Sequence, residues 1–206
     1  MITAQGRRFV MIDDALSQDA FAAWTAAERS VRHRPSFSSI DPVFDGVAFH
    51  ADASFASVDV GADHVEEVKS AIRKGLEILD VRVSDSEHFR FWRYGRGSGL
   101  GWHDDGRGRG AAYTLYLSSE WRATWGGELE LFDCPVDEVP CVESDVPKDL
   151  MNAPVPATSM APRPNRLVVM AAGTFHRVRK VEASAGDSLR RSITGFLAPY
   201  DKMHLS

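Results

Sequence analysis

The sequence predicts a mainly β protein of the α+β class, with two helices packed on an antiparallel β structure that closes as a barrel or a sandwich. Three observations predict this fold. The 206 residues suffice for one domain with a sizeable core. Both segments with helical apolar spacing lie in residues 1–80, and short segments of alternating polarity follow in residues 81–206. Gly, Pro, Asp and Asn separate these short segments, as expected for strands joined by turns.

Two helices are expected in the N-terminal part, after a short strand and turn in RRFVMIDDAL. Ser17 can cap a helix that runs to about Ser30, because Ser is a preferred N-cap residue. A second helix is expected to begin at Asp63, with Glu66 completing a capping box. Its apolar residues recur every three or four positions and form one stripe. The residues of the stripe are Val65, Val68, Ile72, Leu76 and Leu79.

The remaining segments are assigned by their periodicity. Residues 34–60 are rich in Ser, Asp and aromatic residues and are interpreted as short strands and a long loop. After Asp80 the polarity alternates, which is typical of strands. Residues 133–165 are rich in Pro and polar residues, so we expect a loop insertion that could form a lid. The expected strands are HFRFWRY, AAYTLYL, GELELF, RLVVMA, HRVRKV and RRSITGFL.

Composition and charge argue against several function classes. The formal net charge of −5 provides no basic field for nucleic acid or anionic lipid. No apolar run is long enough to cross a bilayer, and the start of the chain lacks the apolar core of a signal peptide. Cys134 and Cys141 do not make a disulfide framework, so free thiols are expected, with a local disulfide as the alternative. We therefore expect a cytoplasmic protein without nucleic-acid or membrane partners.

One constellation of side chains suggests a metal site. In GLGWHDDGRG, His103 and Asp105 are two residues apart, and in an extended segment their side chains point to the same side. Asp104 would point to the other side. His176, in AAGTFHRVRKV, can supply a third ligand from a later strand. Two His and one carboxylate form the facial triad that holds non-haem Fe(II). Zinc is an alternative, because it accepts the same ligand types.

The strand RRSITGFLAP contains a candidate anion site. Arg190, Ser192, Thr194 and Phe196 share one of its faces, whereas Arg191 faces the other way. An inward Arg on a buried strand costs free energy unless an anion meets it, and a guanidinium pairs with a carboxylate through two hydrogen bonds. Arg190 can thus hold the far carboxylate of a cosubstrate such as 2-oxoglutarate, with Thr194 or Ser192 as the hydroxyl partner. The alternative is an Arg exposed on an edge strand.

Taken in order, these motifs resemble the prolyl 4-hydroxylase branch of the iron(II)- and 2-oxoglutarate-dependent oxygenases. The order is H-x-D, a Gly-Gly strand, P-x-x-N-R-L, a His, and R-x-S-I-T-G-F. The corresponding segments here are HDD, WGGELELF, PRPNRLVVM, HRV and RRSITGF. The resemblance covers roughly residues 89–200. It implies a double-stranded β-helix (jelly-roll) core in residues 81–206, helices on one sheet, and a substrate-covering loop near residues 33–55.

The resemblance also implies roles for individual residues. Fe(II) would be bound by the triad, O2 would be the oxidant, ascorbate would support turnover, and Arg190 would bind 2-oxoglutarate. Tyr116 would hydrogen-bond the same carboxylate, and Leu129 would form an apolar wall beside the cosubstrate. Tyr94 matches a second cosubstrate Tyr with an offset of one residue from the family spacing. Without the resemblance, these last three residues would be assigned to the core.

The substrate is less constrained by the sequence. If Tyr94 points inward, Arg90 and Trp92 share its side, and Arg90 could bind a substrate carboxylate or phosphate or could pair with a neighbouring acid. Trp102, Arg107 and Arg109 flank the metal motif, and Trp102 and Arg107 are further substrate candidates. We expect hydroxylation of an aliphatic C–H bond of a small amino-acid-like or biosynthetic molecule. The alternatives are hydroxylation of a prolyl or other residue in a protein or peptide, and a non-catalytic jelly-roll binding module.

Overall fold

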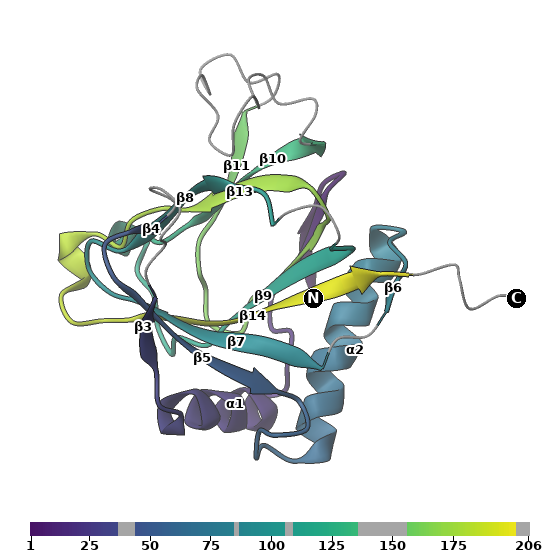
Figure 1. Cartoon of the computed structure of the whole chain (residues 1–206), viewed down its shortest axis with the longest axis horizontal. Helices are drawn as coiled ribbons and strands as arrows, with labels where there is room; N and C mark the ends of the chain where they lie inside the picture. Colours follow the sequence, from purple (N-terminus) through teal and green to yellow (C-terminus); the bar gives the residue numbers. More distant parts are fainter. Residues whose placement is uncertain (37–43, 85–86, 106–108, 136–155, 201–206) are drawn as a thin grey trace, which may run out of the picture.

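The computed structural model describes residues 1–36, 44–84, 87–105, 109–135 and 156–200. Within these residues the protein is mostly β, with two antiparallel sheets that face each other and two helices beside the larger sheet (Figure 1). This arrangement is consistent with the expected jelly-roll. All of the expected strand segments form strands, because alternating polarity suits a sheet with one face toward the helices and one toward the opposite sheet.

The two sheets have these members in pairing order. The larger sheet consists of β1 (Ile2–Gln5), β2 (Phe9–Ile12), β12 (Leu167–Ala171), β9 (Ala111–Tyr116), β14 (Arg190–Pro199), β7 (His88–Tyr94), β5 (Ala48–Ser54) and β3 (Arg34–Ser36), with β6 (Val83–Ser84) paired to β14. The smaller sheet consists of β11 (Ala157–Met160), β10 (Leu129–Pro135), β13 (Thr174–Val178), β8 (Gly99–His103) and β4 (Phe44–Asp45). Two short 3-10 turns are η1 (Ala123–Trp125) and η4 (Ala183–Ala185).

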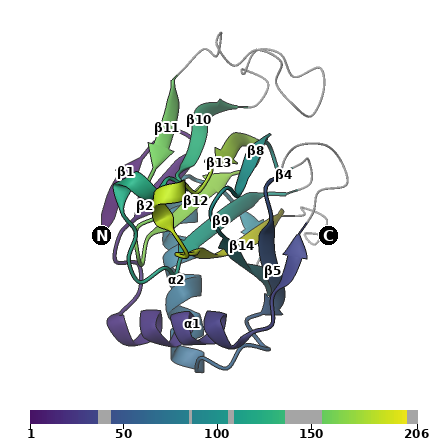
Figure 2. The ribbon, with the colours of Figure 1, turned by 90° about the vertical axis from the view of Figure 1, so that its left-hand side faces the viewer.

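Helix α1 (Gln18–Ser30) begins where the sequence predicts. The Ser17 hydroxyl accepts a hydrogen bond from the Ala20 amide at 3.2 Å, which caps the helix. Trp24 is fully buried and packs against three Phe rings at centroid distances of 5.9, 5.7 and 6.4 Å. Those rings belong to Phe55, Phe89 and Phe91. Figure 2 shows α1 and α2 together below the strands.

Helix α2 (Ala62–Ile78) corrects one expectation. Its N-cap is Gly61 with φ of 86°, and no side chain caps the helix. Asp63 lies inside the first turn, where its negative charge interacts favourably with the helix dipole. Because Gly61 is the N-cap, Glu66 lies beyond the third helical position that a capping box requires. Glu66 instead pairs with Arg73 on the same helix. The expected apolar stripe is correct, because its members are buried or partly buried against the core.

The face of the larger sheet toward the helices contains a buried charge cluster. Glu28 of α1 is fully buried and accepts a hydrogen bond from Arg93 Nε at 2.5 Å. The same oxygen lies 3.4 Å from His33 Nε2, and the other carboxylate oxygen lies 3.1 Å from Arg191 Nε. Arg93 and Arg191 are opposite each other on paired strands, so one carboxylate offsets two adjacent cations. Arg191 therefore faces away from Arg190, as predicted.

The expected insertion at residues 133–165 is shorter in the structure. Strand β10 continues to Pro135, and β11 pairs with β10 within the expected loop. Pro and polar residues hid these strands in the sequence, and residues 136–155 are outside the described part. Cys134 is buried, whereas Cys141 is outside the described residues, so the expectation of free thiols stays a prediction. No described helix is long and apolar enough to cross a membrane.

Candidate metal centre

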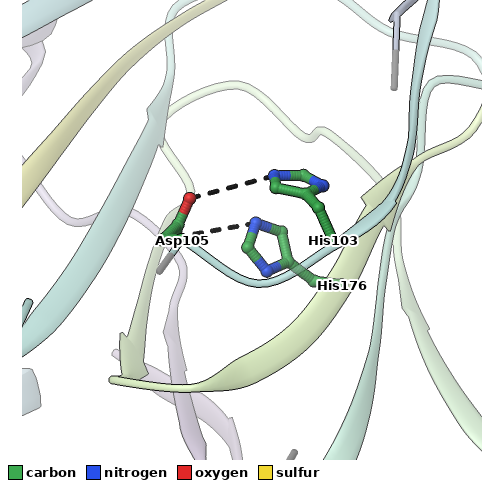
Figure 3. A group of neighbouring side chains, drawn as sticks. All are labelled: His103, Asp105 and His176. Atoms are coloured by element: carbon green, nitrogen blue, oxygen red, sulfur yellow. Dashed lines mark ion pairs between the residues drawn. The ribbon is translucent and has the colours of Figure 1, made fainter. Parts of the chain in front are cut away.

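Three expected metal ligands converge between the sheets. Strands β8 and β13 pair so that His103 lies opposite His176, with ring centroids 4.3 Å apart. Asp105 follows the end of β8, and its carboxylate turns toward both rings (Figure 3). Its oxygens lie 3.8 Å from His103 Nε2 and 3.7 Å from His176 Nε2. The three potential ligand atoms all lie within 4.8 Å of one another.

Backbone carbonyls fix the orientation of both imidazoles. His103 Nδ1 lies 2.8 Å from the Gly101 carbonyl, and His176 Nδ1 lies 2.8 Å from the Thr174 carbonyl. A carbonyl only accepts, so each Nδ1 must carry a proton and donate it. The neutral ring then keeps the lone pair of Nε2 for a cation. Burial lowers the pKa of His103 to about 4, with a further contribution from His176, so this ring is neutral at physiological pH.

Both this constellation and Arg190 line one cavity of about 330 Å³. Arg190 is 2% exposed, and its Nε donates to the Gly127 carbonyl at 2.8 Å. Its Nη2 donates to the Tyr116 hydroxyl at 3.3 Å, and the guanidinium lies 4.8 Å from the centre of the Tyr116 ring and 5.3 Å from that of Tyr94. Among the described residues no acidic side chain pairs with Arg190. A buried cation without a counterion is costly, which suits a carboxylate ligand at this end of the cavity.

Gly127 makes the close packing around Arg190 feasible. Its φ is 72°, in the left-handed region that favours glycine, and a Cβ there would lie 3.0 Å from Arg190 Cδ. The Gly-Gly motif before β10 therefore allows the backbone carbonyl to approach the guanidinium. Leu129, two residues later, is buried and lines the cavity.

The hydroxyl groups near Arg190 are protonated and differ in their partners. Burial raises the pKa of Tyr94 to about 12 and also raises the pKa of Tyr116, so both keep their proton at neutral pH. The Ser192 hydroxyl is buried without a hydrogen-bond partner among the described residues, whereas the Thr194 hydroxyl lies 3.3 Å from that of Thr114. Both Ser192 and Thr194 line the cavity. Ser192 thus offers the cavity a hydroxyl with unused bonding capacity.

The expected substrate residues separate into three cases. Arg90 and Trp92 line the cavity, although Arg90 Nε also donates to Asp52 at 2.7 Å, the acid pair that was the alternative. Trp102 is not among the described residues that line the cavity, which corrects the expectation. It is one residue from His103 on an extended strand, so it projects to the opposite side. There it stacks on Phe132 and Phe175 at 4.7 and 5.6 Å. Arg107 lies outside the described residues.

Further side chains line the cavity beside the expected site residues. Arg109 Nη1 lies 3.6 Å from Asp105 Oδ1, and its guanidinium lies 3.5 Å from the centre of the Phe196 ring. Met170 and Ala112 lie on neighbouring strands of the larger sheet and add apolar wall. Phe196 lies on the face of Arg190 that period two predicts, and it lines the cavity. The positions of Met170 and Ala112 depend on strand pairing, which a single sequence does not reveal.

Comparison with known proteins gives one family match. Residues 89–198 match the family model described as the 2OG-Fe(II) oxygenase superfamily. The matched segment is more than half of the chain, and it contains His103, Asp105, His176 and Arg190. No curated protein sequence matches the chain.

Solved structures share the fold at low sequence identity. A Pseudomonas putida prolyl-4-hydroxylase has a TM-score of 0.66 at 18% identity, over 93% of this chain and 92% of that chain. A Trichoplax adhaerens prolyl hydroxylase in complex with a hypoxia inducible factor peptide fragment has 0.66 at 15%, over 92% and 83%. Streptomyces hygroscopicus HygX, with nickel, 2-oxoglutarate and hygromycin B bound, has 0.63 at 12%, over 93% and 83%.

Proposed function

Because the chain belongs to the 2OG-Fe(II) oxygenase superfamily, a class of oxidoreductases, we propose that it hydroxylates an aliphatic C–H bond of a small amino-acid-like or biosynthetic molecule. The convergence of the triad and a buried Arg190 on one cavity carries this proposal. A cavity of about 330 Å³ suits a small substrate beside a cosubstrate. Its lining mixes apolar walls with a few charged groups, as small-molecule sites do.

His103, Asp105 and His176 would hold Fe(II). Two neutral imidazoles and one carboxylate are the donor set of non-haem iron sites that keep open positions, so the residues fit this ion. When bound, iron with 2-oxoglutarate and O2 supplies oxidative decarboxylation of the cosubstrate coupled to oxygen insertion into the substrate C–H bond. The zinc alternative would leave the buried charge of Arg190 without a function.

The rest of the site would bind and orient the cosubstrate. Arg190 would pair with its far carboxylate through two hydrogen bonds. The Tyr116 hydroxyl, which accepts from Arg190, would donate its own proton to the same carboxylate. Ser192 or Thr194 would add a hydroxyl donor. Leu129 would form an apolar wall that excludes water from the cosubstrate. Tyr94, whose ring stacks near the guanidinium, would fix its orientation.

A second candidate is hydroxylation of a prolyl or other residue in a protein or peptide. One structural relative is a prolyl hydroxylase in complex with a peptide fragment, which makes this substrate class a reasonable alternative. Trp92 lines the cavity and offers an aromatic surface to either type of substrate. We propose no nucleic-acid or membrane partner, in line with the net charge of −5, and a cytoplasmic location.

A turnover assay tests the proposed reaction. The protein would be incubated with Fe(II), ascorbate, 2-oxoglutarate and a panel of amino acids, biosynthetic intermediates and Pro-containing peptides. We expect succinate release, and for one substrate class a gain of one oxygen by mass spectrometry. His176→Ala should abolish both signals, since it removes one proposed metal ligand. Full turnover by this variant would contradict the proposed iron site, and an oxidised peptide alone would favour the second candidate.

A further inference from the structure

A group of charged side chains lies at the end of the cavity where β3, β5 and β7 pair. Arg90 lines the cavity, and its Nε donates to Asp52 Oδ1 at 2.7 Å. Arg34 donates to the other carboxylate oxygen of Asp52, and its Nε donates to His50 Nε2 at 3.0 Å. Asp52 thus orients two guanidinium groups at once. We call Arg34, Asp52 and Arg90 the cationic cluster.

The cationic cluster has an excess of positive charge. The hydrogen bond from Arg90 lowers the pKa of Asp52, so this carboxylate is ionised at neutral pH. Desolvation by burial lowers the pKa of His50, so this ring is neutral. Two guanidinium charges and one carboxylate charge therefore leave a net charge of +1. Both Arg side chains are solvent-accessible, with 67% of Arg34 and 49% of Arg90 exposed, so an anion can reach them.

The side chains that line the cavity also have a positive net charge. The described lining contains three Arg and two Asp residues, a net charge of +1. A divalent metal and the dianion 2-oxoglutarate would cancel each other. The loaded cavity would therefore keep its positive charge. Arg90 shares the carboxylate of Asp52 with Arg34, so this pair of cations keeps one charge for another ligand. Arg190 would hold the cosubstrate, and Arg109 lies 3.6 Å from Asp105. The charged lining residues are Arg90, Arg109, Arg190, Asp104 and Asp105.

The strand register separates this cluster from the cosubstrate end. On paired strands β7 and β14, Arg190 lies opposite Tyr94, and Thr194 lies opposite Arg90. Four residues along a strand correspond to roughly 13 Å. That separation exceeds the length of a five-carbon dicarboxylate whose far carboxylate is bound at Arg190. An anion at Arg90 would consequently belong to a different molecule.

We propose that the cationic cluster binds a carboxylate or phosphate group of the primary substrate. This inference rests on the proposed function, because it treats the cavity as a substrate site. Asp52 acts as a positioning residue that holds Arg34 and Arg90 toward the anion. Trp92 is two residues from Arg90 on β7, so it lies on the same face, and it lines the cavity. Its ring provides a flat apolar surface for the adjoining part of the substrate.

A binding experiment tests the proposal before the substrate is known. The protein would be loaded with Mn(II) and 2-oxoglutarate, which permits no turnover, and titrated calorimetrically with inorganic phosphate and, separately, with acetate. We expect at least one anion to bind with a Kd of about 1–10 mM. Arg90→Gln and Arg34→Gln should each weaken this binding about fivefold or more, and Arg90→Lys should weaken it less, since it keeps the charge.

A matched control variant tests whether the loss of anion binding is specific, and binding of 2-oxoglutarate tests the proposed function separately. Arg73→Gln makes the same charge change in a half-exposed ion pair on α2 and should leave anion binding unchanged. If neither anion binds, or if both Gln variants bind as the native protein does, the inference is overturned. Stronger binding of phosphate would identify a phosphorylated substrate, and stronger binding of acetate a carboxylate. Failure of the native protein to bind 2-oxoglutarate would instead overturn the proposed function.

Discussion

At the scale of single residues, the two adjacent carboxylates of the HDD motif have different surroundings. Asp105 oxygens lie within 4 Å of both His103 and His176, and Arg109 approaches one of them. Asp104 lines the same cavity but is not part of the group of potential ligand atoms. Alternation along extended backbone would place Asp104 on the other side, but both residues follow the end of β8 and both line the cavity. Two neighbouring residues of one type can therefore be separated by experiment.

Metal binding should distinguish these two carboxylates. Asp105→Ala should abolish binding of Mn(II), because only two His ligands would remain, whereas Asp104→Ala should retain it. Equilibrium dialysis followed by elemental analysis of the protein measures both. If the Asp105 variant retained Mn(II) and the Asp104 variant lost it, Asp104 would be the metal ligand and the assignment of Asp105 would be wrong.

The Tyr116 hydroxyl gives a second residue-level prediction. Tyr116→Phe should weaken 2-oxoglutarate binding about 10- to 150-fold, because a hydrogen bond to a charged group contributes roughly 1.5–3 kcal/mol. Calorimetric titration of the Mn(II)-loaded protein measures the change. Tyr113→Phe is a matched control on the same strand, since that hydroxyl is buried in the core on the helix side and has no hydrogen-bond partner among the described residues. Equal losses in both variants would show that the effect is structural.

Much of the site was predictable because its residues lie on few strands. The two-residue spacing of HDD and the face of β14 both follow from period two. Trp102 is a substrate candidate by its proximity to His103 in the sequence, whereas alternation places its side chain on the other side of β8. The partner of Arg90 was not predictable as a particular residue, because Asp52 is 38 residues away and becomes its neighbour only through the pairing of β5 with β7.

At the scale of elements, helix α1 contacts the larger sheet through an apolar and an ionic contact. Trp24 fills a pocket among three Phe rings, and Glu28 meets Arg93 and Arg191. The apolar contact was foreseeable from the periodicity of the helix. The ionic contact was not, because a Glu on a helix is usually exposed. The cap of α2 was also misjudged, since Gly61 rather than a polar side chain occupies the N-cap.

The buried carboxylate should matter more than a surface one. Glu28→Gln should lower the free energy of unfolding by about 3–5 kcal/mol, because it leaves Arg93 and Arg191 without their buried anion. Glu66→Gln, which breaks an exposed pair with Arg73, should cost less than about 1 kcal/mol. Urea unfolding followed by fluorescence gives both values. Similar values for the two variants would show that the Glu28 cluster contributes no more than a surface pair.

At the scale of the whole molecule, the larger sheet separates two environments. One face packs on the helices and holds the main apolar cluster, and the other lines the cavity with charged and hydroxyl groups. Strand β14 contributes to both, because its residues alternate between the faces. The sequence predicted the class of this fold from its periodicities. The order of strands was not predictable from those patterns, because pairing joins residues that are distant along the chain.

The histidines buried in this architecture predict how stability depends on pH. Desolvation by burial is the largest cause that lowers the pKa of His33 and His50, and the pKa of His103 falls to about 4. The unfolded chain therefore binds more protons than the folded protein once the pH falls below about 6.5, so stability is greatest above that value and decreases as the pH falls. The carboxylates of Asp13 and Asp52 have lowered pKa values, and their contributions are lost only at lower pH.

The metal-free protein should consequently lose thermal stability between about pH 7 and about pH 5, before its carboxylates are protonated. Differential scanning calorimetry across this range measures the decrease in Tm. Because His33 lies beside the Glu28 cluster and outside the cavity, His33→Asn should reduce the slope of Tm against pH without affecting 2-oxoglutarate binding. Mn(II) should raise Tm most at the upper end of the range, since protonation of His103 competes with the metal. A Tm that rises on acidification would show that these rings gain rather than lose interactions when protonated.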